Sequence, residues 1–221
     1  NYLEQPYNSD LDFGTGDFCV MGWVKYTGSG TEYVTMRRDT AGAGEGPQLY
    51  SNAGNIIFGG TTGGVVTSSA TYNDGNWHHV VGFRSGASIY LYADGALAVS
   101  GTNSANLTNT SAVLRIGVNH TAAGLFTGSL ALFRISATAP TAEQIAKIYN
   151  DEKFLFQTDA ACTLYGASDA VTALAHDDAT NLLHVGTSAG RSVFQGLRRV
   201  ANTTTAVGTA ISASNGLVVE E

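Results

Sequence analysis

The strongest constraint in this sequence is the way that glycine-bearing turns divide it into short segments of strand-like composition. Asp74-Gly75 precedes one such segment, and Asp94-Gly95 stands between two. Asp-Gly is a signal for a tight hairpin, because the turn needs a positive φ and glycine adopts it without a steric penalty. With 27 glycines and only 3 prolines in 221 residues, such turns recur along the chain. The pattern predicts an all-β sandwich or barrel.

The predicted strands are rich in apolar, β-branched and aromatic residues. They cover residues 18–26, 32–38, 48–50, 55–58, 77–84, 88–93, 96–100, 114–118 and 129–135. One helix is predicted after them, with Ile145, Ile148 and Tyr149 at helical spacing. Thr141 and Gln144 precede this stripe as a capping box, which satisfies two backbone N–H groups at the start of a helix. We expect the helix to dock on the sandwich.

Composition and charge exclude several classes of protein. The chain is 43% hydrophobic and 13% charged, which gives it the material for a core and excludes a disordered polymer. Its formal net charge of -7 leaves no basic surplus for phosphates, so no nucleic-acid partner is predicted. No apolar run approaches the roughly 20 residues that cross a bilayer, so no membrane insertion is predicted.

A change of composition predicts a domain boundary between residues 156 and 157. Residues 157–221 are rich in Ala, Thr and Ser and contain no Trp or Lys. Residues 171–177, 182–187 and 191–194 predict a small antiparallel meander. A segment of this size with few large side chains buries little surface, so we expect this β appendage to pack on a neighbour or to serve oligomerisation.

Residues 2–153 resemble the laminin-G-like, concanavalin A-like jelly-roll domains. The most specific likeness is Gly75-Asn76-Trp77-His78-His79-Val80, followed by the Tyr92-Ala93-Asp94-Gly95 hairpin. Residues 11–25 with Trp23, residues 126–135 and the capped helix are similar to other parts of the family. The resemblance implies an antiparallel jelly-roll sandwich with one short helix. It also implies sugar-binding, adhesive or assembly functions before catalysis.

The polar, charge-poor appendage beside a jelly roll resembles bacteriophage tail fibres and other virion appendage proteins, which complete partial β folds by trimerising. This implies a homo-oligomer, with a trimer favoured, in a virion or extracellular location. The implied partner is a cell-surface glycan or another virion protein. Because the chain starts at Asn1 without an initiator Met, we expect a fragment or processed product of something longer.

Catalysis is not predicted. Glycoside hydrolases need two carboxylates that face each other across a sugar, and hydrolases on this scaffold present them on one strand as Glu-x-Asp-x-(x)-Glu. That spacing is absent from the sequence. His78 and His79 are adjacent on a predicted strand and therefore point to opposite faces, which prevents joint chelation. A degenerate polysaccharide hydrolase remains an alternative.

Asp10, Asp12 and Asp17 surround Gly14 and Gly16 and are the only candidate metal ligands that we select. Ca²⁺ prefers carboxylate and carbonyl oxygens from a flexible loop. The spacing departs from an EF-hand loop, so we favour a solvated loop, expect no cofactor, and keep calcium as the alternative.

Five residues are selected as candidate sugar ligands, because sugars are bound by aromatic faces and planar polar groups. They are Arg37, Asp39, Tyr50, Asn119 and His120, all predicted in or near loops. Cys19 and Cys162 are expected as two thiols, with a bridge between them as the alternative. The sequence thus predicts a non-enzymatic, glycan-binding recognition or adhesion module, with a purely structural phage-particle protein as an alternative.

Overall fold

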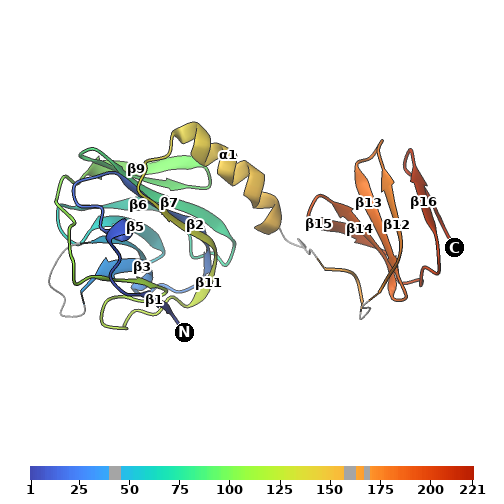
Figure 1. Cartoon of the computed structure of the whole chain (residues 1–221), viewed down its shortest axis with the longest axis horizontal. Helices are drawn as coiled ribbons and strands as arrows, with labels where there is room; N and C mark the ends of the chain where they lie inside the picture. Colours follow the sequence, from blue (N-terminus) through green and yellow to red (C-terminus); the bar gives the residue numbers. More distant parts are fainter. Residues whose placement is uncertain (40–45, 157–162, 167–169) are drawn as a thin grey trace. The chain divides into compact units, whose positions relative to one another are not determined.

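The computed structural model of the chain describes residues 1–39, 46–156, 163–166 and 170–221 (Figure 1). These residues form two compact units, Asn1–Asn150 and Asp151–Glu221. The alternative of a bridge between Cys19 and Cys162 involves residue 162, which lies outside the described residues. Cys19 itself is buried, and burial raises the pKa of its thiol to about 12.

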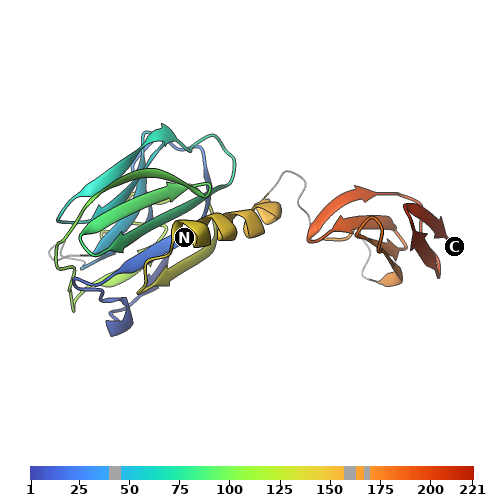
Figure 2. The ribbon, with the colours of Figure 1, turned by 90° about the horizontal axis from the view of Figure 1, so that it is seen from above.

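The first unit is a sandwich of two antiparallel sheets, seen as two layers in Figure 2. The six-stranded sheet has the order β1-β10-β3-β4-β5-β6. Its strands are β1 (Leu3–Gln5), β10 (Val113–Ile116), β3 (Glu32–Arg38), β4 (Pro47–Asn52), β5 (Asn55–Gly60) and β6 (Val65–Thr71). The five-stranded sheet has the order β11-β2-β7-β8-β9. Its strands are β11 (Gly128–Ser136), β2 (Phe18–Tyr26), β7 (His78–Ser85), β8 (Ser88–Ala93) and β9 (Ala96–Thr102).

The two sheets enclose one apolar core, which explains why they pack face to face. Its buried members include Val20 and Val24 of β2, Leu49 of β4 and Phe58 of β5. The Asp94-Gly95 turn has the expected positive φ values, 50° and 81°. The predicted all-β jelly-roll sandwich with one short helix is confirmed.

Helix α1 (Ala142–Glu152) explains why β2 is buried on both faces. Ile145 is fully buried against Cys19 and Met21 of β2 and against β7, on the side of the sheet away from the main core. The capping box is formed: the Gln144 N–H donates to Thr141 Oγ1 at 3.2 Å, and the Thr141 N–H donates to Gln144 Oε1 at 2.9 Å. None of the described helices has the length and apolarity to cross a bilayer. The described residues also form two 3-10 helices, η1 (Ser9–Leu11) and η2 (Lys153–Phe156).

The second unit is a four-stranded meander with one hairpin beside it. The meander consists of β12 (Val171–Asp177), β13 (Leu182–Thr187), β14 (Gly190–Gln195) and β15 (Arg198–Asn202), paired in chain order. The hairpin joins β16 (Ile211–Ser214) to β17 (Leu217–Glu220). The small core of the second unit is formed by Ala173, Val207 and Ile211. The small β-meander appendage expected from the sequence is therefore present.

Candidate functional site

Two stacked tyrosines form the centre of the candidate site on the six-stranded sheet. Tyr33 of β3 and Tyr50 of β4 are direct cross-strand neighbours, and their rings stack with centroids 5.0 Å apart and planes 24° apart. Leu49 beside Tyr50 points into the core, so alternation along β4 directs Tyr50 to the outer face. Burial raises the pKa of both phenols, so both rings are neutral at physiological pH. We call this pair the tyrosine platform.

The loop between β10 and β11 packs against one edge of the tyrosine platform. The Tyr33 N–H donates to the Gly124 carbonyl at 3.0 Å. Gly124 has a φ of 61°, and a Cβ placed there would lie 2.9 Å from the Tyr33 ring. Glycine is thus required both for the backbone conformation and for the close approach of the loop. The same loop contains Asn119 and His120.

His120 lies among charged groups at this edge. Its pKa is lowered, first by burial and then by the positive charges of Arg38 and Arg115, while Asp39 opposes the shift. The His120 carbonyl accepts a hydrogen bond from Arg115 Nη1. Its Nδ1 is buried and has no hydrogen-bond partner among the residues that the structure describes. The lowered pKa keeps the ring neutral at physiological pH, where one ring nitrogen donates and the other accepts.

Arg38 connects His120 to the tyrosine platform. Its charge acts on Tyr33, where it opposes the effect of burial on the phenol pKa, and it also acts on His120. Three of the predicted ligands are thus linked through these residues: Tyr50 stacks on Tyr33, and His120 feels the charges of Arg38 and Asp39. Asn119 lies in the same loop, but its Oδ1 accepts from the Thr121 and Ala123 N–H groups, both at 2.9 Å, and so shapes the loop itself.

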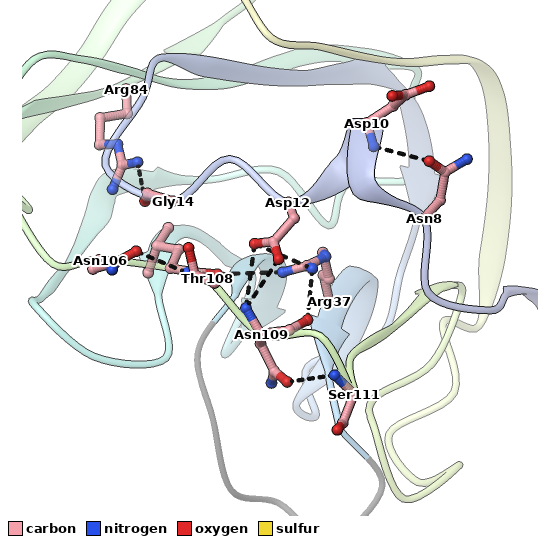
Figure 3. Close-up of polar contacts among 11 residues, drawn as sticks. Asn8, Asp10, Asp12, Gly14, Arg37, Arg84, Asn106, Thr108, Asn109 and Ser111 are labelled. Atoms are coloured by element: carbon pink, nitrogen blue, oxygen red, sulfur yellow. Dashed lines mark hydrogen bonds and ion pairs between the residues drawn. The ribbon is translucent and has the colours of Figure 1, made fainter.

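Arg37 is placed on the opposite face of β3, so the structure corrects its prediction as a sugar ligand. Only 2% of its side chain is exposed, and its Nη2 lies 3.4 Å from Asp12 Oδ1. The guanidinium also donates to the Leu107 carbonyl at 3.3 Å. It donates to the Asn109 carbonyl at 2.9 Å as well (Figure 3). Because its N–H groups bond to these interior groups, Arg37 connects β3 to the loops that contain Asp12 and Asn109, and it does not face a ligand.

The three candidate calcium ligands do not converge. The Asp12 carboxylate is turned toward Arg37 and accepts from the Asn109 N–H at 3.2 Å, while Asp10 lies beside Asn8 (Figure 3). Asp17 Oδ1 accepts from the Gly86 N–H at 2.8 Å. Across the described ranges, no three His, Cys, Asp or Glu side chains lie together as a metal site. The carboxylates of Asp12 and Asp17 thus have structural partners of their own.

His78 bridges two carboxylates at the end of the five-stranded sheet. Its Nδ1 is 2.8 Å from Asp94 Oδ2, and its Nε2 is 3.0 Å from Asp74 Oδ1. The hydrogen bond to Asp94, followed by that to Asp74, raises the pKa of His78, against the opposing effect of burial. Hydrogen bonds from Asn76, followed by the contact with His78, lower the pKa of Asp74 to about 2. The pair ties the turn before β7 to the turn after β8.

His79, as expected from alternation, points the other way. It is fully buried, and its ring lies 5.2 Å from that of Trp23. The two histidines of the Trp-His-His motif therefore serve different layers and do not form a joint metal site.

We expect the stability of the wild-type protein relative to a His78→Gln variant to fall as pH rises from about 5 to about 9. The folded-state pKa of His78 is raised above its ordinary 6.5. Its contribution is thus fully present below 6.5 and is lost as pH rises through the folded-state pKa. Because Asp74 and Asp94 are partly exposed, the effect is about 1 kcal/mol. Urea unfolding at each pH measures it, and a difference that did not vary with pH would contradict this account.

Residues 2–146 match the family of the concanavalin A-like lectin and glucanase superfamily. No curated protein matches the chain. Among solved structures, the binding domain of Paraclostridial Mosquitocidal Protein 1 is similar at a TM-score of 0.55 and 12% identity, over 93% of this chain and 56% of that one. A Bacteroides ovatus protein proposed to bind carbohydrate matches at a TM-score of 0.52 and 11% identity, over 66% of this chain and 44% of that one.

A third structure is that of botulinum neurotoxin type C, whose uptake by cells depends upon interaction with two ganglioside molecules. It matches at a TM-score of 0.53 and 11% identity, over 95% of this chain and 52% of that one. This chain thus spans about half the length of these three structures. At such identities, the similarities show the fold alone.

Proposed function

This chain belongs to the concanavalin A-like lectin and glucanase superfamily, and from that premise we propose that its first unit recognises glycans without cleaving them. The proposed site is the tyrosine platform with Arg38, Asp39 and His120 around it. The observation that carries the proposal is the stacking of Tyr33 on Tyr50 beside polar side chains, on the outer face of the sheet.

The chemistry of this face suits a sugar ring. A pyranose presents patches of C–H groups that pack on aromatic faces, and hydroxyls that need planar donors and acceptors. Neutral tyrosines supply the first, while the charged side chains of Arg38 and Asp39 and the imidazole of His120 supply the second. The likeness of the fold to the Bacteroides and neurotoxin structures, which are associated with carbohydrate and gangliosides, supports the same proposal.

We expect Tyr50→Ala to weaken glycan binding by about tenfold or more, because the substitution removes one aromatic face from the platform. A glycan array identifies ligands, and calorimetry on one of them gives the affinity. Tyr90→Ala is the matched control: Tyr90 of β8 also stacks on an aromatic ring, that of Phe83 at 4.8 Å, but lies on the other sheet. Equal losses from both variants, or full retention in Tyr50→Ala, would exclude the platform.

The hydrolase alternative is tested with the same approach. Cleavage needs a second carboxylate facing the first. Glu4, on the strand next to Arg115, is held by Arg115 Nε at 2.7 Å. We therefore expect the wild type to release no reducing ends from the polysaccharides that it binds. We expect Asp39→Asn to lower the affinity for these polysaccharides without changing that result. Release by the wild type that disappears in Asp39→Asn would favour the hydrolase.

The wider setting that we propose is an oligomeric virion or extracellular assembly, with a trimer favoured, in which the glycan-binding unit serves adhesion. The alternative is a purely structural particle protein whose partners are other proteins. Glycan arrays separate the two, since the structural alternative requires that no sugar binds.

A further inference from the structure

The second unit exposes several large apolar side chains that are not part of its small core. Its buried apolar side chains include Val185, Val193 and Phe194 in the meander. In this part of the described chain the exposed large apolar side chains outnumber the buried ones, and they reach 75% exposure at Leu217 and 62% at Val219, both on β17. Large apolar side chains exposed together on one strand are a feature of interaction surfaces.

Two outer strands of this unit, β15 and β17, present an open edge. β15 pairs with β14, and β17 pairs with β16, and no further partner strand is found for either in the described part of the chain. The other two outer strands, β12 and β16, have no further pairing partner there either, but they contact each other. Figure 1 shows β15 and the β16 hairpin on opposite sides of the unit. An open edge has backbone N–H and C=O groups that pair readily with another strand.

The charges on the two edges are opposite in sign. β15 begins with Arg198 and Arg199, while the chain ends with Glu220 and Glu221 on and after β17. Glu220 already forms an ion pair with Arg191, and Arg199 donates to the Thr163 carbonyl at 2.8 Å. Arg198 is partly exposed and Glu221 is exposed, and neither forms an ion pair among the described residues. The opposite charges left for a contact with a second molecule are therefore those of Arg198 and Glu221.

The Arg198–Glu221 pair also determines the relative direction of β15 and β17. An antiparallel alignment of β15 with β17 that sets Arg198 opposite Glu221 also sets Val200, 37% exposed, opposite Val219. A parallel alignment would bring Arg198 to the apolar start of β17 at Leu217 instead. Cross-strand pairs of opposite charge and of apolar side chains both stabilise a sheet, so the antiparallel alignment is favoured.

We propose that the second unit joins copies of this chain by pairing β15 of one copy antiparallel with β17 of the next. The two edges differ, so the contact is head-to-tail, and such contacts close into a ring when the rotation between copies permits. The apolar β17 residues are then covered by the neighbour. This edge pairing forms the contact between copies in the oligomer of the proposed function, and it does not depend on the glycan site.

The test is sedimentation velocity and light scattering of the full 221-residue chain between about 1 and about 100 µM. We expect a closed oligomer, and we expect Val219→Lys to raise its dissociation constant by about tenfold or more. Arg198→Glu and Glu221→Arg should each weaken assembly, while the double variant should restore it. A monomeric wild type at every concentration would overturn the proposal, as would a double variant weaker than both single ones.

Leu174→Lys is the matched control. Leu174 is 60% exposed, close to Val219 at 62%, but it lies on β12, which pairs with β13 and contacts β16. It should leave assembly unchanged, whereas an effect equal to that of Val219→Lys would show general apolar association and overturn the edge pairing. Each dissociated variant should keep its glycan affinity per chain, so failure of assembly and failure of the glycan site are separate results.

Discussion

Arg37→Met is expected to lower the free energy of unfolding by about 3–5 kcal/mol, the usual cost of removing one partner from a buried ion pair. The substitution leaves Asp12 with a carboxylate whose side chain is 8% exposed and faces no cation at that position. It also removes the donors to the Leu107 and Asn109 carbonyls. Chemical unfolding measured by tryptophan fluorescence would show the loss.

Two variants decide whether the cause is the uncompensated charge. Adding Asp12→Asn to Arg37→Met should recover much of the stability, because a neutral pair of similar volume no longer buries a lone charge. Arg38→Met, one residue along the chain, should lower the free energy of unfolding by less than Arg37→Met does, because Arg38 is only partly buried, but it should weaken glycan binding. If Arg37→Met instead reduced glycan affinity at unchanged stability, the assignment of the two arginines would be reversed.

The contrast between Arg37 and Arg38 also shows where sequence-based prediction of the site fails. Strict alternation from Tyr33 would carry Thr35 and Arg37 to the same outer face. The pairing of β3 with β4 has a bulge between Tyr33 and Thr35, so Thr35 lies opposite the core residue Leu49. A bulge inserts one residue and exchanges the faces beyond it, which turns Arg37 inward and Arg38 outward. The sequence of residues 32–38 carries no glycine or proline that would mark the bulge.

Local signals were sufficient for much of the fold. The Asp94-Gly95 turn and the Thr141/Gln144 capping box depend on residues close in sequence, and both are formed as predicted. The tyrosine platform depends instead on the register between β3 and β4, and His120 reaches it only through the fold of a loop 70 residues further on than Tyr50. Residue types therefore identified candidates, while long-range pairing decided which of them meet.

The contact between Gly82 and Phe58 also depends on long-range packing. Substitutions at these two residues give the second large expected effect on the free energy of unfolding. Gly82 of β7 lies opposite Val20 and Leu91, both core residues, and a Cβ placed on it would overlap the Phe58 ring. Phe58→Ala should lower the free energy of unfolding by about 3–5 kcal/mol, because it leaves a cavity between the sheets. Gly82→Ala alone should cost about 1–3 kcal/mol through overpacking.

The two substitutions should compensate when combined, since the methyl group that Gly82→Ala introduces enters space that the phenyl ring has left. We expect the double variant to be more stable than the sum of the single effects by about 0.5–3 kcal/mol, measured by urea unfolding. Gly30→Ala is the control, because a Cβ there meets nothing within 4 Å. Additive effects would mean that the glycine is required by the backbone of β7 and not by the ring of Phe58. The close approach of the two sheets at this point would then have another cause.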